Sequence, residues 1–230
     1  MISVALAAYK GEKYIAAQID SILVQLGADD ELIVSDDAPG GETERIVMNY
    51  AAEDVRVKYY AGEGRGVVAN FANAISRCSG DVIFLCDQDD VWLEGKVARV
   101  MQAIEGGACL VLHDARETDE NLNTVNPSFF EVRQSRPGLI RNFIKNSYMG
   151  CCMAFTKELA AKALPFPKDI PMHDQWLGLL AEKYGRVEFI NEPLICHRIH
   201  GDNVTGGKTS TKNKIIWRIN LLKALLLVRK

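Results

Sequence analysis

Apolar and polar positions along the first ninety residues follow two alternating periods. Runs rich in β-branched and aromatic residues predict strands at 2–8, 31–35, 55–60 and 81–86. Between these runs, apolar residues recur at helical spacing in the segments 15–26, 42–52 and 71–78. Such alternation is typical of right-handed βαβ units. It predicts an α/β fold with a mostly parallel central sheet and helices on both faces.

The length and composition allow one hydrophobic core. The chain has 230 residues, of which 48% are hydrophobic and 25% charged, so it can bury one core with a small appendage. It begins at Met1 directly with ISVALAAY and lacks the basic lead of a secretory signal, which predicts an intracellular protein. Its six cysteines stand among apolar residues without a C-x-x-C pair and are expected to be buried thiols.

The formal net charge of −3 hides an asymmetry between the body and the tail. Residues 208–230 contain seven basic residues and no acidic residue, whereas residues 1–207 carry 20 basic and 30 acidic residues, a net −10. Binding to a phosphate backbone needs a basic surface. The acidic body therefore argues against nucleic acid as the main partner.

Three aspartates follow the fourth predicted strand within four residues. The segment FLCDQDDVW contains Asp87, Asp89 and Asp90, and Asp36 and Asp37 follow the second strand. Because parallel strands end at the same edge of a sheet, five carboxylates should converge there. They repel one another unless a cation neutralises them, and oxygen ligands suit Mg²⁺ or Mn²⁺. We expect such a metal at Asp87 and Asp89, whereas Asp90, ahead of VWLEGKVARVMQAI, is the expected N-cap of a helix.

Two other functions share this local pattern. CDQDDV also fits the D-x-D-x-[TV] signature of haloacid-dehalogenase-type phosphohydrolases, whose first aspartate is a nucleophile, but those enzymes carry the motif on the first strand. A receiver-like signalling domain also gathers carboxylates around Mg²⁺. It has about half this length and would leave residues 130–230 without a purpose.

The second half of the chain adds two further groups of polar residues. His173 and Asp174 stand just before a predicted helix that packs through Trp176, and this segment leaves Asp174 equally open to a capping and a catalytic role. Arg198 and His200 lie two residues apart at the end of a later strand, hence on one face of it. A histidine paired in this way, in a protein with an acidic metal site, is a candidate ligand.

Six segments in sequence carry a specific resemblance. In order they are ISVALAAYKGEKYI, IVSDDAPGGET, GVVANFANAI, GDVIFLCDQDDVW, MHDQW and HRIHGDNVTG. The set resembles family 2 glycosyltransferases with the GT-A fold, most closely their bacterial rhamnosyltransferase-like branch, over residues 2–206. The resemblance implies an inverting, metal-dependent transfer of a sugar from a nucleoside-diphosphate sugar to a hydroxyl of a glycan or lipid-linked acceptor. The implied setting is bacterial surface polysaccharide synthesis.

The resemblance also implies roles for individual residues. The donor, a UDP- or dTDP-sugar, is expected to contact Ala8, Tyr9, Asp36, Asp37, Asn70, Asp87 and Arg198. The metal, Mg²⁺ or Mn²⁺, would be held by Asp87, Asp89 and His200. Asp174 would be the catalytic base that takes the proton from the acceptor hydroxyl during attack on the anomeric carbon.

The sequence departs from the family pattern at three places. Ala38-Pro39-Gly40-Gly41 stands where Gly-Ser-Thr-Asp is usual, and His197 stands where an aromatic residue is commoner. These two changes concern recognition of the nucleotide base and the geometry around the diphosphate. In many relatives an acidic residue precedes the catalytic base; here His173 stands at that position, and the expected catalytic base, Asp174, is still present.

The chain is expected to divide into a glycosyltransferase domain, 1–207, and a basic apolar helix, 208–230. The domain would hold the nucleotide sugar in its first half, to about residue 113, and the acceptor in its second. The segment 212–230 falls short of the ~20 apolar residues of a spanning helix. Its cations do not gather on one face, so a helix on the inner face of the plasma membrane and a helix packed on the body or on a second copy are both open.

Overall fold

Four parallel strands form the first half of the sheet, as the sequence predicts. The computed structural model describes residues 1–168, 170–200 and 210–228. Its first strands are β1 (Ile2–Ala8), β2 (Glu31–Asp36), β3 (Val57–Ala61) and β4 (Val82–Asp87). β1 pairs with both β2 and β4, and β2 pairs with β3. β1, β2 and β4 are buried almost throughout, which explains why they read as continuous apolar runs.

The second half of the sheet mixes strand directions. Its members are β5 (Val91–Trp92), β6 (Leu110–Thr118), β7 (Thr124–Asn126), β8 (Met153–Thr156) and β9 (Val187–Arg198). β8 runs antiparallel between β4 and β6, and β9 pairs parallel with β6 and antiparallel with β5. The strand order is β3-β2-β1-β4-β8-β6-β9-β5, with β7 added to β6. The long strand β9 therefore returns the late part of the chain to the loop after β4.

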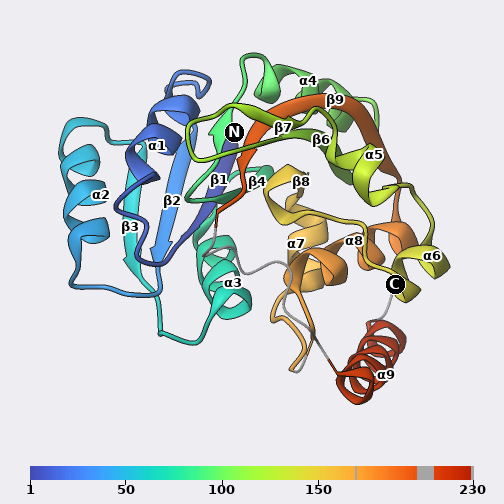
Figure 1. The fold of residues 1–230 in the computed structure, drawn as a ribbon. Coiled ribbons are helices and arrows are strands. Elements are labelled where there is room, and N and C mark those ends of the chain that lie inside the picture. The colour runs from blue at the N-terminus through green and yellow to red at the C-terminus, as the bar shows by residue number, and fades with distance from the viewer. Residues whose placement is uncertain (169, 201–209, 229–230) are drawn as a thin grey trace.

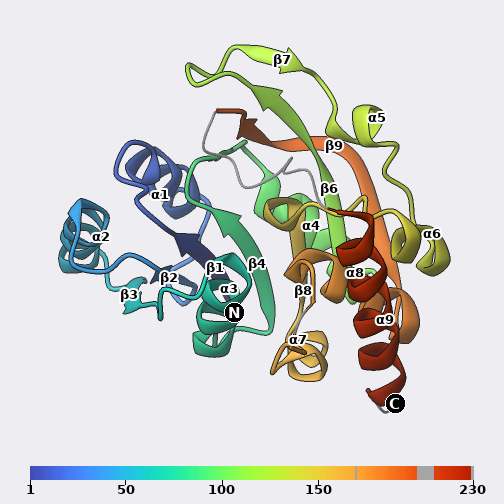
Figure 2. The same ribbon diagram turned by 60° about the horizontal axis from the view of Figure 1, so that its bottom comes forward.

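Helices surround this sheet (Figure 1). They are α1 (Ile15–Leu23), α2 (Glu42–Glu53), α3 (Val67–Arg77), α4 (Lys96–Glu105), α5 (Phe129–Arg133), α6 (Leu139–Ile144), α7 (Lys157–Ala163), α8 (His173–Tyr184) and α9 (Thr211–Leu227), together with a 3₁₀ turn at Gly150–Cys152. The three helices expected between the first strands are confirmed. Figure 2 shows α9 lying alongside α8. Among the described residues, no helix has both the length and the apolar character needed to cross a bilayer.

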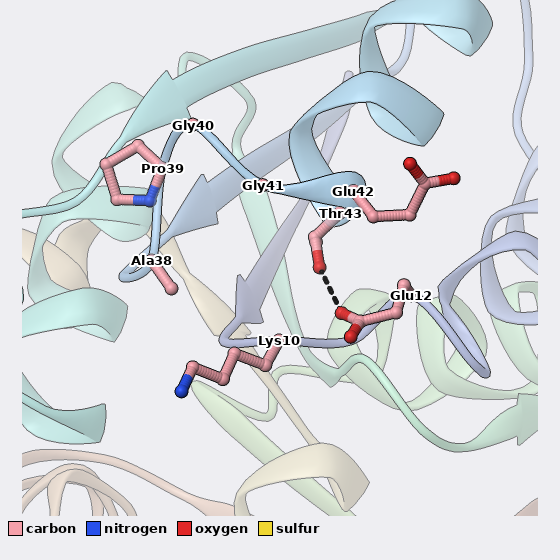
Figure 3. A pocket seen from close by; sticks show the side chains of 8 residues that line it. All are labelled: Lys10, Glu12, Ala38, Pro39, Gly40, Gly41, Glu42 and Thr43. Carbon is pink, nitrogen blue, oxygen red and sulfur yellow. Dashed lines mark hydrogen bonds between the residues drawn. The ribbon is translucent and has the colours of Figure 1, made fainter.

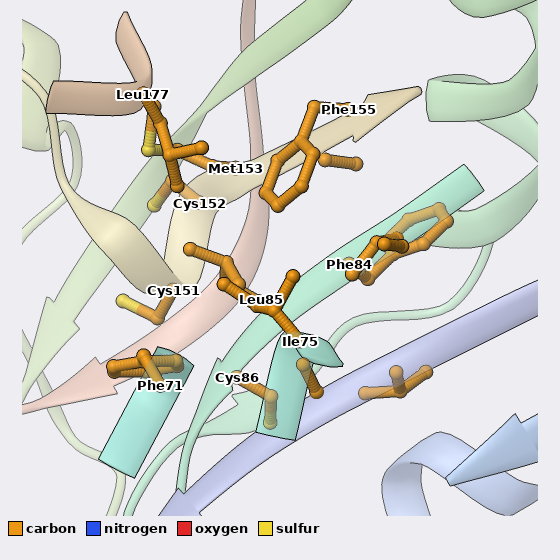
Figure 4. Close-up of a cluster of buried hydrophobic side chains, with 14 of the residues drawn as sticks. Phe71, Ile75, Phe84, Leu85, Cys86, Cys151, Cys152, Met153, Phe155 and Leu177 are labelled. Atoms are coloured by element: carbon orange, nitrogen blue, oxygen red, sulfur yellow. The ribbon is translucent and has the colours of Figure 1, made fainter. Parts of the chain in front are cut away.

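The core joins the two halves of the molecule around β4. Figure 4 shows side chains of α3, β4, the 3₁₀ turn, β8 and α8 in one cluster, with Phe71, Phe84, Leu85, Phe155 and Leu177 among them. Cys86, Cys151 and Cys152 are buried in the same cluster. All six cysteines of the chain are free thiols, and four of them are fully buried, as the sequence predicts for most of them.

The ends of three neighbouring strands place the predicted acidic residues at one edge of the sheet. In the strand registers Ala7 lies opposite Asp87, and Ala8 lies opposite Asp36. Asp37 directly follows β2, and Asp89 lies two residues beyond the end of β4. The expectation that the two acidic groups share one edge is confirmed.

The expectation that Asp90 caps a helix is wrong. Residues 91–92 form β5 and pair with Cys196 and Ile195 of β9, and α4 begins only at Lys96. Asp90 is 1% exposed, and its Oδ1 atom lies 2.8 Å from Nδ1 of His197. Burial lowers the pKa of His197, but the charge of Asp90 and the hydrogen bond to it outweigh burial and raise that pKa to about 10. Asp90 and His197 therefore form a buried ion pair at neutral pH.

Asp90→Ala should destabilise the protein by roughly 3–5 kcal/mol, because it leaves the imidazolium of His197 buried without its partner. Urea unfolding of both variants would measure the change in free energy of unfolding. The control is Asp81→Ala. Asp81 pairs with the N-terminal amine at 3.2 Å, and the Asp81 side chain is 80% exposed. Loss of this exposed pair should lower the free energy of unfolding by about 1 kcal/mol or less. Equal losses for the two variants would contradict a structural role for the buried pair.

Candidate active site

Gln88, between the two aspartates of the D-x-D segment, ties the loop after β4 to the loop after β1. Its Oε1 atom accepts a hydrogen bond from the backbone N–H of Tyr9 at 2.7 Å, and its Nε2 atom donates to the Tyr9 carbonyl at 2.9 Å. A β-carbon at Gly11 would lie 2.1 Å from Oε1 of Gln88, so a larger residue there would displace the amide. Sequence reasoning missed this residue, because nothing marks the middle position of D-x-D as more than a spacer.

Asp36 and Asp37 are buried, and both organise backbone turns. The two carboxylate oxygens of Asp37 accept from the N–H groups of Gly64 at 2.8 Å and Gly66 at 2.6 Å, which fixes the loop between β3 and α3. Asp36 accepts from the N–H of Ala38 at 3.0 Å, and burial raises its pKa. The acidic pair therefore shapes the loops at the edge of the sheet, whatever else it contacts.

Asn70 supports the same edge from inside. Its side chain is buried on α3, where Nδ2 donates to the Ala8 carbonyl at 2.9 Å and Oδ1 accepts from the hydroxyl of Ser35 at 2.5 Å. Ala8 is itself buried, and its carbonyl also accepts from the N–H of Asp37 at 2.8 Å. Asn70 and Ala8 thus align the ends of β1 and β2.

A pocket of about 420 Å³ opens between the loops that follow β1 and β2 (Figure 3). It is lined by Lys10, Glu12, Ala38, Pro39, Gly40, Gly41, Glu42 and Thr43. The segment 38–41, where the sequence departs from the family pattern, forms one wall. Thr43 closes the base of the pocket, because its hydroxyl donates to Glu12 at 3.1 Å and accepts from the N–H of Gly11 at 2.8 Å. Tyr9 stands exposed at the end of β1, with the Lys10 ammonium 5.4 Å from its ring centre.

Asp87 and Asp89 lie in an environment that disfavours their negative charge. Burial and then the charges of Asp90 and Asp89 raise the pKa of Asp87. Burial and the charge of Asp90 also raise the pKa of Asp89, although its hydrogen bond with His200 acts in the other direction. A cation bound beside these carboxylates would relieve the repulsion, so the residues fit the metal that the sequence predicts.

The late residues Arg198 and His200 both lie against the ring of Tyr14, and His200 also bonds Asp89 directly. The guanidinium of Arg198 lies 4.9 Å from the Tyr14 ring centre, and the ring of His200 lies 5.3 Å from it. Nε2 of His200 is 2.8 Å from Oδ2 of Asp89. The expectation that the two residues share one face of a strand is wrong, because β9 ends at Arg198 and His200 lies beyond it; both residues nevertheless contact Tyr14. Tyr14, just ahead of α1, was not identified from the sequence.

The described residues bring together a set of potential metal ligands that differs from the predicted set of Asp87, Asp89 and His200. Within the described part of the chain, Asp90, Cys151 and His197 form a set whose ligand atoms all lie within 4.8 Å of one another. Oδ2 of Asp90 has no hydrogen-bond partner among the residues that the structure describes. The thiol of Cys151 is a poor ligand for Mg²⁺ or Mn²⁺, and Nδ1 of His197 is already bonded to Asp90. We therefore interpret this group as the buried ion pair described above.

Asp174 is the second residue of α8 and does not cap it. The N-cap is Met172, and Oδ1 of Asp174 accepts from Nδ2 of Asn146 at 3.2 Å and from the N–H of Gln175. Burial raises the pKa of Asp174 to about 6, against the hydrogen bonds from Gln175 and Asn146 and the more distant charge of Arg133. A carboxylate with a pKa near neutrality can accept a proton from a weakly acidic group and release it again.

His173, the neighbour of Asp174, is unsuited to accept a proton near neutral pH. Its ring stacks on Phe71 of α3 with 4.0 Å between ring centres, and neither ring nitrogen has a hydrogen-bond partner among the described residues. Burial lowers the pKa of His173 to about 3. The neutral ring instead packs the start of α8 against α3.

Comparison with known proteins identifies the family. The model for Glycosyl transferase family 2 matches residues 3–164. The chain belongs to glycosyl transferase family 2. The haloacid-dehalogenase and receiver alternatives are therefore wrong, in agreement with the position of the D-x-D on β4, the fourth strand in sequence.

Curated relatives cover most of the chain at low identity. A UDP-Glc:alpha-D-GlcNAc-diphosphoundecaprenol beta-1,3-glucosyltransferase of Escherichia coli is 24% identical over 90% of this chain and 81% of its own length. A dTDP-rhamnosyl transferase of Shigella flexneri is 25% identical over 91% of this chain and 76% of its own. An uncharacterized glycosyltransferase of Nostoc is 23% identical over 88% of this chain, and the match spans 66% of that relative.

Solved structures confirm the GT-A fold. S. aureus TarS 1-349 in complex with UDP-GlcNAc superposes with a TM-score of 0.77 at 16% identity, over 100% of this chain and 67% of that one. A mannosyltransferase from Pyrobaculum calidifontis in complex with GDP-Man and Mn²⁺ superposes with a TM-score of 0.62 at 16% identity, over 98% of this chain and 61% of that one.

Asp174→Asn should stabilise the protein at pH 8 and leave its stability unchanged at pH 4. The pKa of Asp174 is higher in the folded protein than in the unfolded chain, so the penalty for ionising it appears as pH rises from about 4 to 6 and is complete above that range. Asparagine keeps the Oδ1 acceptor and removes the charge, so the gain at pH 8 should be up to about 3 kcal/mol.

Urea unfolding at the two pH values would measure this gain, with Asp29→Asn at an exposed position as the control. A loss of stability at pH 8 on Asp174→Asn would show that the carboxylate contributes to the fold and is not held there against its charge.

Proposed function

We propose that this family 2 enzyme is an inverting, metal-dependent glycosyltransferase. It would move a sugar from a UDP- or dTDP-sugar to a hydroxyl of a glycan or lipid-linked acceptor in bacterial surface polysaccharide synthesis. The observation that carries this proposal is the separation of two kinds of carboxylate. Asp87 lies close enough to Asp90 and Asp89 for their charges to raise its pKa, and Asp89 bonds His200, whereas Asp174 lies on α8 with a pKa of about 6.

The donor would lie along the ends of β1, β2 and β4. The pocket between the loops after β1 and β2 is lined by Lys10 and Ala38, which follow Tyr9 and Asp37 in the chain, and a pyrimidine base would lie against the glycine turn at 40–41. One relative is described as using UDP-Glc, and another is described as a dTDP-rhamnosyl transferase. Because both of these nucleotides carry a pyrimidine base, the relatives support a pyrimidine nucleotide as the donor. Arg198, at the end of β9, offers a positive charge toward the diphosphate.

Asp87, Asp89 and His200 would hold Mg²⁺ or Mn²⁺. The metal would act as a Lewis acid toward the diphosphate and stabilise the negative charge of the departing nucleotide. The carboxylates suit this task because burial and mutual repulsion already raise their pKa values. Gln88 would keep the D-x-D loop in register with the β1 loop, so that the metal ligands and the nucleotide contacts move together.

Asp174 would act on the acceptor. As the acceptor oxygen forms its bond to the anomeric carbon, the bond from that carbon to the diphosphate oxygen breaks, and its electron pair leaves with the nucleoside diphosphate. The hydroxyl proton passes to Asp174, whose orientation is set by Asn146. A single displacement of this kind inverts the anomeric configuration. Relatives described as acting on diphosphoundecaprenol-linked sugars support a lipid-linked acceptor.

The metal proposal predicts that nucleotide binding depends on Asp89. With Mn²⁺ present, UDP or dTDP should raise the melting temperature of the wild-type protein, because a ligand stabilises the state that it binds. Excess chelator or Asp89→Ala should remove most of this shift, whereas Asp20→Ala, on α1, should retain it. Nucleotide binding that persists at full strength in chelator would contradict the role of the metal.

The base proposal predicts that Asp174→Asn lowers transfer by about 10²–10⁴-fold and leaves nucleotide affinity unchanged, since general base catalysis has that typical magnitude. In the wild-type enzyme, kcat/KM should fall below a pH of about 6, because protonated Asp174 cannot accept the proton. Release of nucleoside diphosphate from the sugar donor would measure both effects. Transfer within a few-fold of wild type would show that the base is another group.

A further inference from the structure

Helix α9 has one buried and one exposed apolar face. Leu221, Ala224 and Leu225 are buried against the body. The C-terminal end is fixed on α8, where Nζ of Lys183 donates to the Leu225 carbonyl and the hydroxyl of Tyr184 donates to the Val228 carbonyl, both at 2.5 Å. The packed helix that the sequence left open as one alternative is thus confirmed, and packing uses only part of its surface.

The exposed face is a continuous apolar stripe. It consists of Ile215, Ile219, Leu222 and Leu226, which are 47–74% exposed. Their spacing of four, three and four residues places them in one row along the helix, within about 60° at 100° per residue. On α6, whose last carbonyl accepts a hydrogen bond from Arg218 of α9 at 2.6 Å, Ile140 and Ile144 are also exposed. Four large side chains in one row differ from the isolated apolar residues found on most protein surfaces.

Basic residues border this stripe on both sides. At 100° per residue, Arg218 lies on one side of the row and Lys223 on the other. Lys223 also lines a groove of about 360 Å³ between α7, α8 and α9, together with Lys162 and Lys168. Residues 208–230 contain no acidic residue, although the body carries a net −10.

We propose that the stripe on α9 binds the surface of an anionic phospholipid bilayer. Apolar side chains would enter the boundary between headgroups and acyl chains, and Arg218, Lys223 and the lysines of the groove would meet lipid phosphates. A second copy of the chain is a poorer occupant of the same face, because pairing two α9 helices would bring their basic borders together. This inference goes beyond the transfer reaction and does not rest on it.

The proposed surface adjoins the acceptor side of the candidate site. Ile144, which ends α6 and bonds Arg218, stands two residues before Asn146, the partner of Asp174. A bilayer against α9 would therefore lie beside the segment that orients the candidate base.

Sedimentation with lipid vesicles tests this proposal without a sugar donor. The full chain should bind vesicles that contain phosphatidylglycerol more tightly than vesicles of phosphatidylcholine alone, and salt should weaken the binding. The double variant Ile219→Glu/Leu226→Glu should reduce binding at least about tenfold, because it places two charges in the stripe. Lys223→Glu should reduce it by about tenfold.

The matched control is Val24→Glu/Val55→Glu, which changes two apolar residues that are 83% and 88% exposed on another part of the surface. This control should bind vesicles like the wild type, and both double variants should keep the wild-type melting temperature. The proposal is overturned if the intact protein ignores anionic vesicles, or if the stripe variant binds them as the control does. Light scattering gives a third outcome. If the wild type and the control are oligomers, the stripe variant is a monomer and vesicle binding is the same for all three, the stripe joins two copies and the proposal is overturned.

Discussion

The concentration of negative charge at one buried edge of the sheet is the constraint around which the site is built. Parallel strands β1, β2 and β4 end side by side, and five aspartates follow two of them. A buried carboxylate must be paired or hydrogen-bonded, or it will bind a proton. Each of these carboxylates is accommodated differently. Asp37 accepts hydrogen bonds from backbone amides, and Asp36 accepts from an amide and a tyrosine hydroxyl. Asp90 bonds His197, Asp89 bonds His200, and Asp87 has a raised pKa.

These solutions explain why the late part of the chain must return to the D-x-D loop. His197 and Arg198 belong to β9 and His200 follows it, more than a hundred residues after Asp87, and the two histidines bond Asp90 and Asp89. Strand β9 can deliver them because it pairs with β5, directly after Asp90. Fold and site are thus coupled: the strand pairing that closes the sheet also neutralises its acidic edge.

The sequence predicts the regular part of this arrangement well and the interactions between loops poorly. Strand and helix periods place β1 to β4 within two residues, because buried parallel strands have a strong apolar signal. Asp90 was misassigned because a local N-cap pattern and a long-range strand pairing compete for the same residues, and the pairing with β9 prevails. Gln88 and Asn146 act through contacts with residues 79 and 28 positions away, which no local pattern reports.

Helix α9 combines two features that the sequence analysis treats as alternatives: it packs on the body, and it presents an apolar face to the outside. A helix of 17 residues has room for a packed face and a separate exposed face, and the cations of α9 lie on both sides of the exposed one. On a helical wheel of the whole segment, those cations do not gather on one face, so the sequence shows no single polar face. With one face buried against α8, they form a border around the remaining apolar row instead. Packing on the body therefore makes the helix amphipathic toward the outside, which its sequence alone does not.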